Sequence, residues 1–87
     1  MRSKKTIRLN KVVLDVLKLH TPDLVEFGLA LKSIPGVREV NVTLKEKDVD
    51  TDTVVVVLVG DFNMNEVRAK IEELDAKINS IDEVVIW

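Results

Sequence analysis

Cysteine is absent from this 87-residue sequence, which also contains only three glycines and two prolines. The lack of cysteine excludes thiol catalysis, thiolate metal sites and disulfides, and it fits a reducing compartment. So little glycine and proline excludes a flexible linker or a low-complexity segment. Aromatic residues make up 3% of the chain, which leaves few side chains on which nucleic-acid bases can stack.

An excess of charge of either sign is also missing, because 13 basic and 15 acidic side chains give a net charge of -2. This balance does not predict a surface for polyanions. The longest apolar run has six residues, far fewer than the roughly 20 that cross a membrane. No small-residue cleavage site follows the basic start, so we expect a cytoplasmic protein without a secretory signal. Abundant charge (32%) and no glutamine are typical of a heat-adapted source.

The densest apolar stretch is Thr53–Gly60, in which five valines and one leucine run together. β-Branched residues favour strands, and because apolar residues do not alternate with polar ones here, both faces of this strand need cover. The stretch Ile7–Leu19 predicts a second central strand, with a bulge or a late strand start near Asn10, where its alternation changes phase. In this second strand, Val12, Leu14 and Val16 share one face, and Val13, Asp15 and Leu17 share the other.

Capping, turn and periodicity signals predict four further segments. They are a helix from Pro22 to about Ser33 with Thr21 as its N-cap, an alternating edge strand over Val37–Lys47, a helix after Asn63 whose apolar stripe extends to Ile78, and a last strand over Ile81–Trp87. The order strand, helix, strand, strand, helix, strand is typical of the ferredoxin-like split βαβ fold. It predicts one α+β domain over residues 6–87, with an antiparallel sheet of order 4-1-3-2 and both helices on one face. A basic arm at 1–5 precedes the domain.

Four blocks of the sequence resemble a small archaeal family known only as a domain of unknown function. They are LDVLK at Leu14–Lys18, the helix start at Pro22, GVREVNV at Gly36–Val42 and SIDEVV at Ser80–Val85. The resemblance implies a ferredoxin-like fold and assembly into multi-subunit rings, and it implies no functional residue. More distantly, the layout is similar to ACT regulatory domains, which bind small molecules. The chain departs from those domains at Leu19–Pro22, where they usually carry a glycine.

The ferredoxin-like fold hosts many functions, so the side chains must decide between them. The predicted central strands carry no aromatic residue on which RNA bases stack. A metal chaperone of this shape needs paired cysteines, and an acylphosphatase needs an arginine after the first strand, where Leu19–Asp23 has none. With three serines, one histidine and no cysteine, no nucleophile and base form a recognisable set. We therefore predict that the protein is not an enzyme.

Three residues are candidates for a ligand site, namely Asp15, His20 and Thr21. His20 and Thr21 lie in the turn after the first strand, where a histidine acts as a ligand contact, as a pH-sensitive joint, or as a turn residue bonded to local backbone. Asp15 is a charge on an otherwise apolar outer face, and a buried charge needs a partner. That partner is a cation of another subunit, the water of a channel, or Lys11 on the same face. A solvated carboxylate is the remaining alternative.

The hairpin before Thr53–Gly60 carries Asp48, Asp50 and Asp52 at alternate positions. Oxygen-rich loops of this kind bind divalent cations such as Ca²⁺. An EF-hand loop would require a glycine at Thr53 and a glutamate at Val59, and both are missing. The alternative interpretation is a solvated hairpin tip with no metal.

Self-association is predicted from apolar side chains that a single domain leaves uncovered. With both helices on one side of the sheet, Val13, Leu17 and alternate valines of Thr53–Gly60 face outward, together with either Val85 and Trp87 or Val84 and Ile86. On the first helix, Val25 and Leu29 fall outside the buried stripe. The predicted interface residues are therefore Val13, Leu17, Val25, Leu29, Val85 and Trp87. Joining strand two of one chain to strand four of the next closes a ring, and face-to-face dimers are the alternative.

Three functional hypotheses follow, from different classes. The first is a non-enzymatic, homo-oligomeric regulatory or scaffold domain with a small-molecule site between its subunits. The second is a divalent-cation module that uses the hairpin aspartates. The third, which ranks last, is weak nucleic-acid binding through the basic arm at 1–5.

Overall fold

The computed structural model describes residues 7–87, so the basic arm predicted at 1–5 lies outside the described residues. Six elements follow one another: β1 (Arg8–Leu19), α1 (Leu24–Lys32), β2 (Val37–Lys47), β3 (Thr51–Asn63), α2 (Met64–Glu73) and β4 (Lys77–Val85). The four strands form one antiparallel sheet in the order β2-β3-β1-β4. The predicted ferredoxin-like topology is confirmed, because this order is 4-1-3-2 counted from the other edge.

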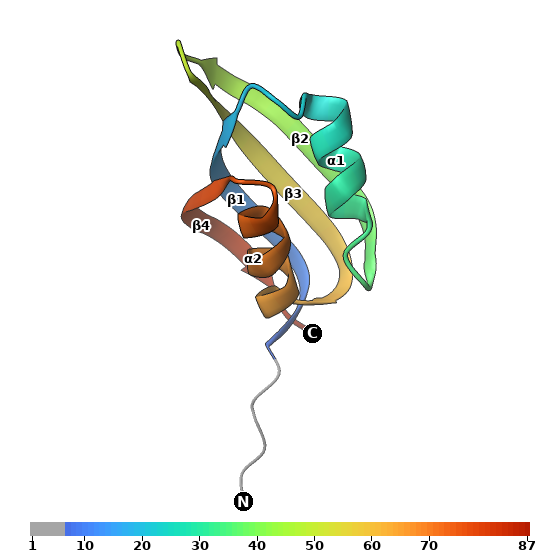
Figure 1. The fold of residues 1–87 in the computed structure, drawn as a ribbon. Coiled ribbons are helices and arrows are strands. Elements are labelled where there is room, and N and C mark those ends of the chain that lie inside the picture. The colour runs from blue at the N-terminus through green and yellow to red at the C-terminus, as the bar shows by residue number, and fades with distance from the viewer. Residues whose placement is uncertain (1–6) are drawn as a thin grey trace, which may run out of the picture.

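Both helices lie on one face of the sheet, with α1 beside β2 and α2 beside β1 and β4 (Figure 1). The core lies between the two layers, and its fully buried members include Val12, Leu14, Val16, Phe27, Leu31, Val54, Val56, Leu58, Val67 and Ile71. The apolar residues of the opposite face are half-buried, and they are Val13, Leu17, Val55, Val57, Val59 and Val85. No helix within residues 7–87 is long and apolar enough to cross a membrane.

Strand β1 alternates as the sequence predicts. Val12, Leu14 and Val16 are buried under the helices, whereas Val13 and Leu17 lie on the other face. The predicted bulge is confirmed, because the pairing of β1 with β3 shifts between Leu9 and Lys11. The shift brings the earlier apolar residue Leu9 onto the buried face, where it is 4% exposed.

The predicted start of the first helix is wrong. Helix α1 begins at Leu24, and its N-cap is Asp23 instead of Thr21. The Asp23 carboxylate accepts from the Glu26 backbone N–H at 2.9 Å, and the Glu26 carboxylate accepts from the Asp23 N–H at 3.3 Å. This reciprocal capping box satisfies two helix-end donors, which a lone threonine hydroxyl cannot do.

The second helix is shorter than predicted, although its N-cap, Asn63, is confirmed by a 2.8 Å bond from the Asn65 N–H. The helix ends at Glu73, and Asp75 adopts a left-handed backbone conformation with φ 58°. A left-handed residue stops a helix and reverses the chain. Ile78, predicted to lie on the helical stripe, is therefore part of β4, which begins four residues earlier than the predicted Ile81.

Candidate functional site

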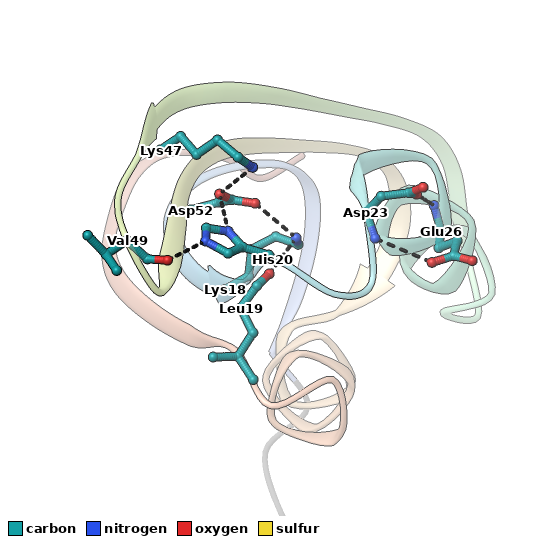
Figure 2. A network of polar contacts seen from close by, with 8 residues as sticks. All are labelled: Lys18, Leu19, His20, Asp23, Glu26, Lys47, Val49 and Asp52. Carbon is teal, nitrogen blue, oxygen red and sulfur yellow. Dashed lines mark hydrogen bonds and ion pairs between the residues drawn. The ribbon is translucent and has the colours of Figure 1, made fainter.

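A cluster of polar side chains lies where β1 ends and β3 begins. Lys18 continues the inward-facing series of β1, and the sheet register places it opposite Asp52, which pairs in turn with Lys47 of β2. His20 follows β1 and points into the same cluster (Figure 2). Lys18 is 1% exposed and Asp52 is 4% exposed. Charged groups are buried to this extent only when they are paired.

Asp52 is the centre of the cluster because two lysines and a histidine converge on its carboxylate. Lys47 Nζ lies 3.2 Å from Oδ1, His20 Nδ1 lies 2.8 Å from Oδ1, and Lys18 Nζ lies 3.4 Å from Oδ2. Burial by itself raises the pKa of Asp52, but the hydrogen bonds and charges of Lys47 and His20 outweigh it. The pKa of Asp52 is therefore lower than its ordinary value, and the group is ionised at neutral pH.

Lys18 has its remaining contacts inside the protein. Its ammonium donates to the Leu19 carbonyl oxygen at 2.7 Å and lies 5.5 Å from the centroid of the Phe27 ring. An aromatic face attracts a cation, which offsets part of the cost of burying it. Because Lys18 is covered on all sides, it has no access to a substrate and stabilises the fold through Asp52.

His20 joins the end of β1 to the tip of the β2–β3 hairpin. Its Nδ1 faces Asp52, and its Nε2 lies 2.8 Å from the Val49 carbonyl oxygen (Figure 2). The two ring nitrogens therefore reach acceptors on two different segments, a side chain of β3 and the backbone of the hairpin tip. His20 is thus engaged with the long-range partner Asp52 as well as with backbone, and it is only partly exposed.

The other two predicted ligand residues are not part of this cluster. Thr21 is exposed in the turn after His20. Asp15 lies on the helix-free face of the sheet, and its Oδ1 is buried without a hydrogen bond. Of the alternatives for Asp15, the pairing with Lys11 is wrong: Lys11 Nζ pairs with Glu83 at 3.2 Å, while Lys45 Nζ lies 3.6 Å from Asp15 Oδ1. The register explains this, because Lys11 lies nearer the opposite end of the sheet, on the row of Val85.

The three hairpin aspartates differ in their surroundings. Asp48 and Asp50 are exposed, whereas Asp52 is buried among cations. Within residues 7–87, no group of three or more histidine, cysteine, aspartate or glutamate side chains is arranged to hold a metal ion. The calcium site at the hairpin stays a prediction. Calorimetry tests it, by titrating Ca²⁺ into the protein and into the Asp50→Asn variant.

A second candidate site is an open apolar groove between α1 and the edge strand β2. It has a volume of about 550 Å³, and its walls include Leu24, Val25, Leu29, Val40 and Val42. Val25 and Leu29 are 69% and 67% exposed, as predicted for the uncovered flank of the first helix. Lys32, Arg38 and Glu39 also line the groove, so charges of both signs lie beside its apolar walls. Such a groove is suited to an apolar segment.

Comparison with known proteins identifies the family of the chain. The family model DUF211, described as an uncharacterized ArCR, matches residues 10–87. The chain belongs to the DUF211 family. A relative of this DUF211 protein is "Uncharacterized protein MJ0319" of Methanocaldococcus jannaschii, which is 38% identical over 78 residues. That alignment covers 88% of the present chain and 80% of the relative, and the predicted archaeal resemblance is confirmed.

The family match of the DUF211 protein spans both candidate sites, because Lys18, Asp52 and the whole groove lie within residues 10–87. Lys18 was not among the predicted site residues, and Asp52 was predicted as a metal ligand. A signal for the pair was present: Lys18 follows Val12, Leu14 and Val16 at alternate positions, so strand periodicity turns it inward.

Proposed function

We propose that this DUF211 protein is a non-enzymatic, cytoplasmic, homo-oligomeric regulatory or scaffold module. The observation that supports it is the position of seven of the ten large apolar side chains that are exposed within residues 7–87. Three of the seven, Val25, Leu29 and Leu44, lie on α1 and β2 at one edge of the sheet, and four, Ile81, Val84, Ile86 and Trp87, lie on or after β4 at the other. The remaining three, Ile7, Leu19 and Val49, belong to neither group. Apolar patches on a small protein mark contact surfaces.

The energy available from these side chains supports association. Burying one large apolar side chain contributes about 1.5–3 kcal/mol. Seven such groups supply on the order of 10 kcal/mol before the costs of association are subtracted. The two patches lie at opposite edges, so a contact between unlike edges repeats from chain to chain and closes into a ring when the rotation fits.

The regulatory part of the proposal places a small molecule between the subunits. A second pocket, of about 290 Å³, lies between α2 and β4 and is lined by Arg68, Ile71, Lys77 and Ile78. It adjoins the β4 edge, and pockets at subunit contacts are common ligand sites. A thermal-shift screen with metabolites and divalent cations tests this part, since a ligand stabilises the form it binds. If no compound raises the melting temperature, the protein is a scaffold without a ligand.

Leu29→Lys tests the oligomer itself, because it places a charge in the exposed apolar flank of α1. We expect light scattering to show a smaller assembly while circular dichroism shows an unchanged fold. Ala69→Lys is the matched control, because Ala69 is exposed on α2 and lies about 200° around the helix from the buried Val67 and Ile71. An unchanged assembly in Leu29→Lys removes α1 from the interface, and a parent protein that scatters as a single chain contradicts the proposal.

A further inference from the structure

The two edge strands carry helix-side apolar residues at matching heights of the sheet. Following the paired positions from β2 through β3 and β1 to β4 gives three rows: Val40–Leu58–Val12–Val84, Val42–Val56–Leu14–Ile81 and Leu44–Val54–Val16–Ile78. In an antiparallel sheet, directly paired residues point to the same face. Each row therefore has an apolar side chain at both edges, on the side of the helices.

The direction of the strands allows a second copy to continue the sheet. Neighbouring strands are antiparallel throughout the order β2-β3-β1-β4, so β2 and β4 run in opposite directions. When a second copy lies beside the first in the same orientation, its β4 is antiparallel to β2. The outward backbone groups of both edge strands then pair with each other, as they do inside the sheet.

The groove between α1 and β2 supplies the space that the incoming side chains need. Val40 and Val42 form its wall on the sheet, and Val25 and Leu29 form its wall on α1. A neighbouring β4 on the same rows brings Val84 beside Val40 and Ile81 beside Val42. Val84 and Ile81 are 47% and 42% exposed in the single chain, and the groove covers them.

The charged end of the groove matches the end of the chain after β4. The Trp87 N–H donates to the Asn10 side-chain oxygen at 2.9 Å, and the Asn10 amide donates to the Gly60 carbonyl, while Gly60 pairs with Val37. Trp87 therefore lies at the height of Val37, at the opposite edge of the same sheet. When a second copy continues the sheet, its Trp87 comes next to Arg38 of the first. Within residues 7–87, Arg38 takes part in no ion pair. The face of an indole ring attracts such a cation.

We infer that β4 of a second copy docks on β2 in this register, with Ile81 and Val84 in the α1–β2 groove and Trp87 against Arg38. The inference rests on the proposed function and identifies the occupant of the groove. A slip of one residue would turn Ile81 and Val84 to the helix-free face, away from α1. A slip of two residues keeps their face but moves Trp87 about 7 Å along the strand, away from Arg38. The rows thus select the face, and the contact of Trp87 with Arg38 selects the register.

The absence of cysteine makes disulfide cross-linking a clean test. On the helix-free face, the rows Asn41–Val57–Val13–Glu83 and Glu46–Thr53–Leu17–Lys77 bring two further pairs together at the joint. Paired residues have Cα atoms about 4.5–5.5 Å apart, within reach of a disulfide. The test variants are Asn41→Cys with Glu83→Cys, and Glu46→Cys with Lys77→Cys. The crossed combinations, Asn41→Cys with Lys77→Cys and Glu46→Cys with Glu83→Cys, are the controls.

We expect mild oxidation to link the two in-register variants into ladders of chains on a non-reducing gel. The crossed variants stay single, because their cysteines lie more than about 10 Å apart. Equal linking of the crossed variants, or no linking in a protein that sediments as an oligomer, overturns the register and leaves the proposed function standing. A parent protein that sediments as a single chain overturns both.

Discussion

Lys18 Nζ lies 3.4 Å from Asp52 Oδ2 across the β1–β3 pair, and both side chains are almost fully buried. Asp52 also accepts from His20 and Lys47, so one carboxylate holds together β1, the turn after it and the β2–β3 hairpin. Breaking a buried ion pair is costly because the remaining charge stays in a poorly solvated place. The cluster therefore stabilises the end of the sheet opposite the start of β1 and the end of β4 (Figure 1).

Asp52→Asn is expected to lower the melting temperature more than Lys18→Met does. Loss of the Asp52 charge leaves Lys18 buried with only the Leu19 carbonyl and the Phe27 ring as partners. Loss of the Lys18 charge leaves Asp52 with Lys47 and His20 as partners. Thermal unfolding followed by circular dichroism measures both changes, and Asp48→Asn, at an exposed hairpin position, is the control. A larger loss in Lys18→Met than in Asp52→Asn contradicts this order.

Acid is expected to destabilise the protein through Asp52. Its folded-state pKa lies below the ordinary value of 3.8, so its contribution to stability is complete above the unfolded-state pKa and is lost as the pH falls through the folded-state pKa. The free energy of unfolding should therefore fall below about pH 4. Urea titrations between pH 7 and pH 2 measure this fall. It should be smaller in Asp52→Asn, and parallel curves for the two proteins would refute the assignment.

Asp15→Val is expected to stabilise the protein. Asp15 Oδ1 is buried without a hydrogen bond, and its ion pair with the largely exposed Lys45 spans 3.6 Å. An exposed ion-pair partner at this distance contributes little, and the neighbours of Asp15 on its face include Val13, Leu17 and Val55. An unsatisfied buried polar atom costs about 1–3 kcal/mol, and a gain of 1 kcal/mol raises the melting temperature of a domain this size by about 4–8 °C. Thr43→Val, on the same row but exposed, is the control. A lower melting temperature in Asp15→Val would contradict this, and would show that the ion pair with Lys45 outweighs the cost of burying the carboxylate.

The fold was predictable because local signals and topology agree. The valine run Thr53–Gly60 and the alternation of Ile7–Leu19 identify two strands with both faces covered, and the ferredoxin-like order puts those two strands in the centre. Helix ends were less predictable, since Thr21 and Asp23 are both good N-caps. Only the reciprocal bond with Glu26 favours Asp23. The end of α2 was likewise hard to predict, because the left-handed residue there is Asp75 and not the glycine that usually marks a helix end.

The candidate site was predictable only in part. His20 was identified, and so was the exposed flank of α1 at Val25 and Leu29. The cluster around Asp52 was missed because it depends on cross-strand register, which places Lys18 and Lys47 on either side of Asp52. A single sequence shows which face a residue occupies, but a register is set by bulges and turn lengths along both strands.

Both proposals depend on head-to-tail oligomers that form through the two sheet edges. Trp87, the one tryptophan of the chain, is 91% exposed in the single chain and is covered at the inferred joint. The most direct measurement is sedimentation velocity at micromolar concentration, with Trp87 fluorescence recorded over a dilution series. We predict an oligomer whose emission shifts to the red as dilution separates the subunits. A single-chain species at every concentration, with the emission of a fully exposed indole throughout, would contradict the account.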